Sequence, residues 1–182
     1  MNIYLVRHGE AAASWDQDRD PGLSDRGHAQ AKSLADNLAS RLVPNTKLRS
    51  SPLKRAQQTA APLAQVLGTT VRIDNAFREV PSPASLDDRN AWLKATMKRH
   101  WPDQPQELQQ WRKEIMTALK SLHEDTVIFT HFVVINAVTS FLTGKTETTC
   151  CYPDYISVTI LKNDNGALSV IETGAQMITH IN

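Results

Sequence analysis

The sequence has few cysteines, no long apolar run and almost no net charge, and each shortage excludes a class of protein. The two cysteines among the 182 residues, Cys150 and Cys151, are neighbours. A vicinal pair has poor geometry for a structural disulfide and the wrong spacing for a metal site, so we expect two reduced thiols. No apolar stretch approaches the ~20 residues that span a bilayer. A basic leader followed by an apolar segment is also missing, so we expect a cytoplasmic protein that does not bind membranes.

The charge balance excludes a broad basic surface for nucleic acid. The formal net charge is +1, with 21% charged and 41% hydrophobic residues, which is ordinary for a globular protein. An anion site would therefore have to come from a local cluster of arginine and histidine. The chain has no repeat, low-complexity tract or linker, so we expect a single domain over residues 1–182.

Apolar runs alternate with helical periodicity along the chain. Strands are expected at 3–6, 47–50, 69–73 and 126–130, and helices at 25–41, 53–67, 86–100, 107–123 and 133–142. Pro62 predicts a kink or a break near Ala61. Residues 155–161 and 167–173 alternate in polarity and are joined by Asn-Asp-Asn-Gly at 163–166, which predicts a β-hairpin. The fold class is therefore α/β: a three-layer α/β/α fold with a mostly parallel sheet and a C-terminal β-hairpin.

Cationic and titratable residues follow the expected strands. Arg7 and His8 come after the first strand, Arg55 begins the helix after the second, Glu79 lies in the loop after the third, and His131 ends the strand at 126–130. The carboxyl ends of parallel strands share one edge of a sheet, so these residues should converge. Arginine cannot ligate a metal ion and repels one, so we expect no metal site and no cofactor. The set is instead suited to phosphate.

These residue types are also suited to phosphoryl transfer, which depends on positioning and charge stabilisation. Neutral His8 can attack phosphorus if its other ring nitrogen is fixed by a hydrogen bond. A protonated His131 would neutralise charge on the equatorial oxygens. A protonated Glu79 would supply a proton to the leaving oxygen and then activate water. Glu79 has a simpler alternative role, as an ion-pair partner of Arg78 or of a pocket arginine.

Four ordered motifs resemble the histidine phosphatase superfamily, also called phosphoglycerate mutase-like. They are Leu-Val-Arg-His-Gly-Glu at 5–10, Leu-Ser-Asp-Arg-Gly-His-Ala-Gln-Ala at 23–31, Ser-Ser-Pro-Leu-Lys-Arg-Ala-Gln-Gln-Thr-Ala at 50–60 and Val-Ile-Phe-Thr-His at 127–131. The resemblance implies that His8 is the phosphorylated residue and that Glu79 occupies the position of the proton donor. It places Arg7, Arg55 and His131 around the phosphate.

Three further features follow from that resemblance. Ser14, in the loop after the first motif, is a candidate hydroxyl contact to the phosphate. Phe132 and Val133 follow His131 where the family often has glycines, so the phenyl group would narrow the pocket or form an apolar wall for the leaving group. Residues 80–83, Val-Pro-Ser-Pro, replace a loop that contains glycine in many members. This last departure leaves the donor position and the substrate open.

The leading function is hydrolysis of phosphomonoesters through a phosphohistidine on His8, with a phosphorylated small molecule or a phosphoprotein as substrate. A protein phosphohistidine phosphatase is an alternative, because small members of that type have similar openings and Glu10-Ala11 fits them. Such members usually lack the acid donor. A phosphoglycerate-type mutase is the third possibility, and a phospho-ligand binder without catalysis on the same fold is the fourth. The sequence leaves the oligomeric state open.

Overall fold

The computed structural model describes residues 1–14 and 16–177 and contains a six-stranded sheet in the order β3-β2-β4-β1-β5-β6. The strands are β1 (Asn2–Arg7), β2 (Lys47–Ser50), β3 (Val71–Ile73), β4 (Thr126–Thr130), β5 (Val158–Asp164) and β6 (Ala167–Glu172). The first four are parallel to one another, whereas β5 runs antiparallel to β1 and to β6. The predicted mostly parallel sheet with a C-terminal hairpin is confirmed.

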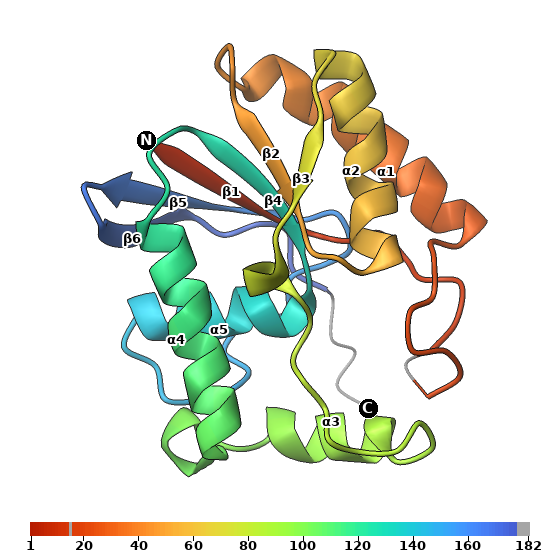
Figure 1. Cartoon of the computed structure of the whole chain (residues 1–182), viewed down its shortest axis with the longest axis vertical. Coiled ribbons are helices and arrows are strands. Elements are labelled where there is room, and N and C mark those ends of the chain that lie inside the picture. The colour runs from red at the N-terminus through yellow and green to blue at the C-terminus, as the bar shows by residue number, and fades with distance from the viewer. Residues whose placement is uncertain (15, 178–182) are drawn as a thin grey trace.

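Helices cover both faces of this sheet. They are α1 (Asp25–Leu38), α2 (Lys54–Leu67), α3 (Arg89–Met97), α4 (Gln106–Lys120) and α5 (Phe132–Leu142), with single 3-10 turns at Ala39–Arg41, Asn75–Phe77 and Trp101–Asp103. Figure 1 shows α1 and α2 on one face, α4 and α5 on the other, and α3 apart from both pairs. The three-layer prediction is therefore confirmed. Among the described residues, no helix combines the length and the apolarity needed to cross a membrane.

Successive side chains of the central strands point to opposite faces of the sheet, and the core is therefore divided into two clusters. Leu5 and Ile128 pack with buried residues of α4 and α5, such as Ile115. Val6 and Phe129, their neighbours in sequence, pack on the opposite face with α1 and α2. Side chains of a strand point alternately to its two faces, so a central strand that is buried throughout supplies both layers. This burial fixes the register of β1 against β4.

Helix α2 is continuous through Pro62, so the break predicted near Ala61 does not occur. A proline inside a helix costs about 3 kcal/mol. Thr59, Ala60 and Leu63 are fully buried on the inner face of the helix and pack it onto the sheet and α1. We infer that this packing outweighs the cost of the proline.

The hairpin begins later than predicted. Strand β5 starts at Val158 and not at Tyr155, because Ile156 has a φ of 56°, outside the extended region. The strand then continues to Asp164, where Asn165 and Gly166 both have positive φ. A two-residue hairpin turn of type I′ needs positive φ at both positions. The turn signal in the sequence was therefore correct, but the strand before it was placed too early.

Candidate active site

The residues predicted to converge do lie together at the carboxyl ends of the parallel strands. Arg7, His8, Arg55 and Glu79 line one cavity of ≈ 380 Å³. His131 lies behind them, wholly buried, with its ring centroid 5.2 Å from that of His8. We call these five residues the polar centre.

Hydrogen bonds from two neighbouring elements fix the position of His8. The backbone N–H of His8 donates to the carbonyl of Thr130 at 3.0 Å, which continues the β1–β4 pairing by one residue. The N–H of Gly9 donates to Thr59 Oγ1 at 3.0 Å, and this hydroxyl donates to the carbonyl of Arg55 at 2.7 Å. The turn after β1 is thus tied to the first turns of α2, which also present the Arg55 side chain.

The start of α1 holds the other side of this turn. Ser24 caps α1 by accepting from the N–H of Gly27 at 3.0 Å, and its hydroxyl donates to Glu10 Oε1 at 2.8 Å. The N–H of Glu10 donates to Gln30 Oε1 at 2.8 Å. A Cβ at Gly27 would collide with the carbonyl oxygen of Glu10, so only glycine permits this approach. The Leu-Ser-x-x-Gly-x-x-Gln pattern therefore serves to hold the turn that follows β1.

The hydrogen bonds of His8 determine where its proton lies. Nδ1 is 2.7 Å from the carbonyl of Gly9, and Nε2 is 3.1 Å from Arg55 Nε. The guanidinium can only donate, so Nε2 is the acceptor and Nδ1 carries the hydrogen. Burial, together with the positive charge of Arg55, lowers the pKa of His8 well below its ordinary value. The imidazole is therefore neutral near pH 7, with its lone pair on Nε2.

His131 is also neutral near pH 7, and not protonated as expected from the sequence. Burial lowers its pKa well below the usual value, and the charge of Arg55 lowers it further. Its Nε2 lies 2.7 Å from the Ser51 hydroxyl. Its Nδ1 lies 3.6 Å from Glu79 Oε2 and has no hydrogen-bond partner among the described residues. When Ser51 donates to Nε2, Nδ1 is a free donor.

The carboxyl group of Glu79 lies between Arg55 and His131. Its Oε2 is 3.6 Å from Arg55 Nη2 and the same distance from His131 Nδ1. Burial raises the pKa of Glu79 above its usual value, although the charge of Arg55 and the hydrogen bond from the N–H of Val80 oppose the shift. The carboxyl group therefore keeps its proton to a higher pH than an exposed glutamic acid.

Arg7 is held from three sides. Its Nη1 donates to the carbonyl of Pro153 at 2.8 Å and lies 3.4 Å from the sulfur of Met177. Its Cζ is 4.2 Å from the ring centroid of Tyr155 and 5.3 Å from that of Phe132. Burial lowers its pKa, as it does for Arg55, yet arginine remains a cation in proteins. The polar centre thus contains two fixed positive charges.

Buried nitrogen donors of the polar centre lack protein partners. Among the described residues, Arg7 Nε, Arg55 Nη1 and His131 Nδ1 have no hydrogen-bond acceptor. Buried polar groups are nearly always paired, and exceptions are found where a ligand or catalysis uses them. Three such donors, two of which belong to guanidinium cations, are complementary to an oxyanion such as phosphate.

Two other predicted residues line the same cavity. Phe132 is the first residue of α5, with its ring centroid 6.1 Å from that of Tyr152. Ser14 lies in the exposed loop after β1, and its hydroxyl donates to Asp16 Oδ1. The hydroxyl is therefore engaged within its own loop.

Several residues in or next to the cavity were not predicted from the sequence. They are Tyr152, Tyr155 and Met177 from the C-terminal part of the chain, Leu93 and Met97 from α3, and Ser51, which contacts His131. The antiparallel pairing of β5 with β1 brings the start of β5 to the end of β1, where Arg7 donates its N–H to the carbonyl of Ser157. Only this pairing could have revealed the tyrosines. Ser51 follows β2 at the same edge, so its position alone was a usable signal.

Comparison with known proteins agrees with this geometry. The family model of the histidine phosphatase superfamily (branch 1) matches residues 3–175. A probable phosphoglycerate mutase GpmB from Enterobacter sp. (strain 638) is 30% identical over 122 residues, which cover 64% of this chain and 50% of that protein. The putative phosphoserine phosphatase 2 of Hydrogenobacter thermophilus is 27% identical over 162 residues, 78% of each chain. The chain therefore spans about half the length of the probable mutase it matches.

Solved structures share the fold. A mycobacterial glucosyl-3-phosphoglycerate phosphatase in complex with inorganic phosphate aligns with a TM-score of 0.75 at 20% identity, covering 96% of this chain and 97% of that chain. A phosphoserine phosphatase from Entamoeba histolytica in complex with 3-phosphoglyceric acid aligns with a TM-score of 0.72 at 18% identity, with the same coverage. At these identities the similarity establishes the fold.

Proposed function

The chain belongs to the histidine phosphatase superfamily, and on this basis we propose that it hydrolyses phosphate monoesters through a phosphohistidine on His8. The observation that supports this most directly is the 3.1 Å contact between Arg55 Nε and the lone-pair nitrogen of His8. A nucleophile and a phosphate-binding cation are therefore next to each other. The reaction needs no metal ion, because Arg7 and Arg55 supply the positive charge.

In the first step, Nε2 of His8 attacks phosphorus in line with the ester oxygen. The N–P bond forms, the P–O ester bond breaks, and Glu79 gives its proton to the leaving oxygen. The two guanidinium groups and the Nδ1–H of His131 stabilise the charge on the phosphoryl oxygens. The carbonyl of Gly9 keeps the hydrogen of His8 on Nδ1, so the ring attacks as the correct tautomer.

In the second step, water attacks phosphorus and the N–P bond breaks. The Glu79 carboxylate takes the proton from the water, which restores the acid for the next cycle. Inorganic phosphate leaves, and His8 returns to its neutral form. The raised pKa of Glu79 suits both roles, because the group must hold a proton in one step and release it in the other.

The covalent intermediate is the direct test. Rapid denaturation of the protein during turnover of a phosphate ester, at alkaline pH where phosphohistidine persists, should give an intact mass that is larger by one phosphoryl group. His8→Ala should abolish this species and lower kcat by at least ~10⁴-fold, as loss of a nucleophile does in other enzymes. His28→Ala is the matched control, because His28 is exposed on α1. Full activity of His8→Ala would exclude the proposal.

A mutase is the second candidate, because several curated relatives are named probable phosphoglycerate mutases. In a mutase, the phosphoryl group on the histidine is transferred back to the substrate and not to water, and a phosphorylated cofactor is needed for this. Incubation with 3-phosphoglycerate and 2,3-bisphosphoglycerate, followed by phosphorus NMR, distinguishes the two. Appearance of 2-phosphoglycerate indicates a mutase, whereas inorganic phosphate alone indicates a phosphatase.

A further inference from the structure

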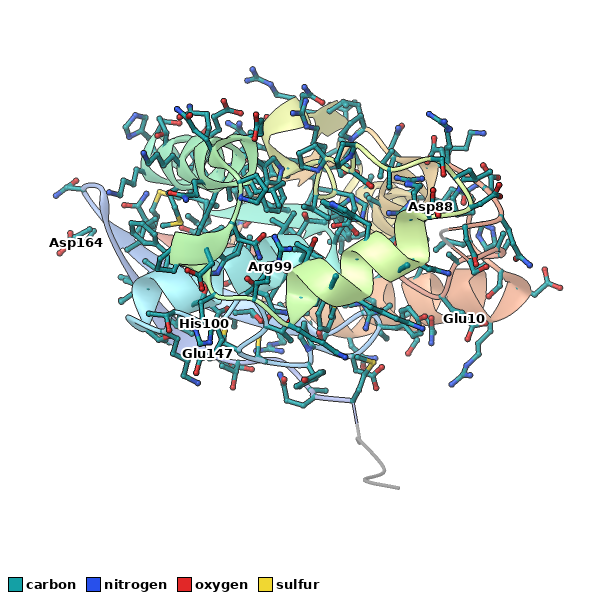
Figure 2. The ribbon with its side chains drawn as sticks, turned by 90° about the horizontal axis from the view of Figure 1, so that it is seen from below. Glu10, Asp88, Arg99, His100, Glu147 and Asp164 are labelled. Atoms are coloured by element: carbon teal, nitrogen blue, oxygen red, sulfur yellow. The ribbon has the colours of Figure 1, made fainter. Side chains whose placement is uncertain are left out.

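Five apolar or aromatic side chains line the active-site cavity beside the polar centre. We call Leu93, Met97, Phe132, Tyr152 and Met177 the apolar wall; all five line the same cavity as the polar centre. Leu93 and Met97 are four residues apart on α3, so they lie on one face of that helix. Figure 2 views the molecule from the side where α3 lies, between the labelled Asp88 and Arg99.

Among the described lining residues, no cation remains to bind a second anionic group once Arg7 and Arg55 hold the phosphoryl group. Among the described residues that line the cavity, Arg7 and Arg55 are the only arginines and there is no lysine. Both belong to the polar centre, where the phosphoryl group needs them. Glu79 would repel a carboxylate on the leaving group whenever it is ionised. Arg89 interacts electrostatically with Glu79 and Arg55 but is not a lining residue.

Resting on the proposed function, we infer that the preferred substrates carry an uncharged leaving group that is apolar or aromatic. Aromatic rings offer a large rigid surface for such a group, and the rings of Phe132 and Tyr152 are already 6.1 Å apart and tilted by 56°. Methionine adapts its shape to different apolar ligands, which suits Met97 and Met177 to this role. A carboxylate placed against these side chains would lose its hydration without gaining a partner.

This substrate class differs from the ones in the names of the relatives. Phosphoglycerate and phosphoserine carry a carboxylate close to the phosphate, and such a group requires a third cation or a polar cradle in the site. The described lining residues of this cavity supply no third cation, and their only hydroxyl groups beside the polar centre are those of Ser14, Tyr152 and Tyr155. The inference therefore separates this chain from those relatives by the chemistry of its apolar wall.

Three esters with alcohol leaving groups test the inference on the full-length chain. Benzyl phosphate carries an aromatic ring, propyl phosphate is small and uncharged, and 3-phosphoglycerate carries a carboxylate. We expect kcat/KM for benzyl phosphate to exceed that for propyl phosphate by about tenfold or more, which is the scale of a few apolar contacts. The value for 3-phosphoglycerate should be the lowest of the three.

Variants of α3 show whether the apolar wall causes the preference. Leu93→Asn keeps the size of the side chain but makes it polar, and should lower the ratio of benzyl to propyl phosphate about tenfold. Ala95→Asn is the matched control, because Ala95 is exposed on the same helix and does not line the cavity. Met97→Gln provides a second variant if Leu93→Asn folds poorly. Inhibition by inorganic phosphate should be unchanged in all three, since the polar centre is intact.

Binding of phosphonates separates the inference from the proposed function. Calorimetry with benzylphosphonate and 3-phosphonopropionate measures the ligand preference without any turnover. Tighter binding of benzylphosphonate, lost in Leu93→Asn, supports the inference even if no ester is hydrolysed, in which case only the proposed function fails. Equal or tighter binding of 3-phosphonopropionate, or faster turnover of 3-phosphoglycerate than of benzyl phosphate, overturns the inference and leaves phosphatase activity intact.

Discussion

The polar centre consists of buried side chains near the ends of neighbouring strands, whereas the apolar wall consists of partly exposed side chains, most of which come from α3 and from the C-terminal part of the chain. In the polar centre, His131 is fully buried and Arg55 is 3% exposed. In contrast, α3 has a single buried residue, Thr96, and its C-terminal end is held by backbone hydrogen bonds from Trp101 to Thr146 and from Thr148 to Arg99. The two parts of one cavity therefore differ in how tightly the fold constrains them.

This difference indicates that the polar centre and the apolar wall have separate roles in the reaction. Charges and dipoles that are buried and fixed before the substrate arrives stabilise a transition state most effectively, because they need no reorganisation. An apolar wall needs only shape and hydrophobicity, so its residues can change without loss of the fold. We expect substitutions in the polar centre to lower turnover of every ester and substitutions in the apolar wall to change the choice among esters.

After removal of the nucleophile itself, the largest effect is expected for Arg55→Lys. Lysine keeps the charge but cannot contact both His8 Nε2 and Glu79 Oε2, which Arg55 reaches through two different nitrogens. Loss of one preorganised donor costs about 10²–10³-fold in kcat, and we expect this loss for benzyl and propyl phosphate alike. Steady-state kinetics with both esters provide the measurement.

Arg49→Lys is the control for this substitution. Arg49 pairs with Asp74 at 2.7 Å and lies outside the cavity. The activity of Arg49→Lys should therefore remain within about twofold of the wild-type activity. A loss in Arg55→Lys that is confined to one of the two esters would break the distinction between the polar centre and the apolar wall.

The next effect concerns Glu79→Gln and its dependence on pH. The pKa of Glu79 is raised, so the wild-type carboxyl stays protonated to a higher pH than usual, and activity should fall as pH rises through that pKa. The pKa of His8 is lowered, so the nucleophile stays neutral at pH values well below 6.5. Activity on alkyl phosphates should therefore be highest between the lowered pKa of His8 and the raised pKa of Glu79. Glu79→Gln should lower kcat/KM about 10²-fold at that optimum and abolish the decrease at higher pH.

Phosphohistidine as the substrate adds a second readout to this variant. Its leaving nitrogen needs less help from an acid, so a phosphohistidine phosphatase would lose little activity in Glu79→Gln. A large loss on propyl phosphate with a small loss on phosphohistidine would establish Glu79 as the acid. Glu172→Gln is the exposed control. A pH profile of Glu79→Gln that matches the wild type would rule out Glu79 as the donor.

The same comparison explains what the sequence could reveal. Each residue of the polar centre follows a strand or begins a helix, and parallel strands bring those positions to one edge whatever the details of packing. The motifs around His8 are short and readable in the sequence, and Gly27 and Thr59 belong to two of them, although their contacts with Glu10 and Gly9 join separate parts of the chain. Local sequence therefore predicted the fold class and the grouping of Arg7, His8, Arg55, Glu79 and His131.

Of the apolar wall, only Phe132, which directly follows His131, could be predicted in this way. Met177 reaches Arg7 only because β5 returns antiparallel to β1 and the segment after β6 then pairs with Tyr152 through the N–H of Met177. The contact between Met177 and Arg7 joins residues 170 positions apart, and no local pattern encodes it. The helix expected at 86–100 is likewise shorter in the structure, where α3 spans Arg89–Met97, because backbone hydrogen bonds with residues 146 and 148 hold the chain at 99–101 in another conformation.

The smallest effect is expected for Met177→Ala. The sulfur of Met177 lies 3.4 Å from Arg7 Nη1, and the side chain lines the cavity as part of the apolar wall. A methionine contact is worth about 0.3–1.5 kcal/mol, so KM for benzyl phosphate should rise about two- to tenfold while kcat is nearly constant. Ile171→Ala, at an exposed position of β6, should change neither constant. If Met177→Ala instead lowered kcat a hundredfold on both benzyl and propyl phosphate, Met177 would be a positioning residue for Arg7. It would then have to be grouped with the polar centre and not with the apolar wall.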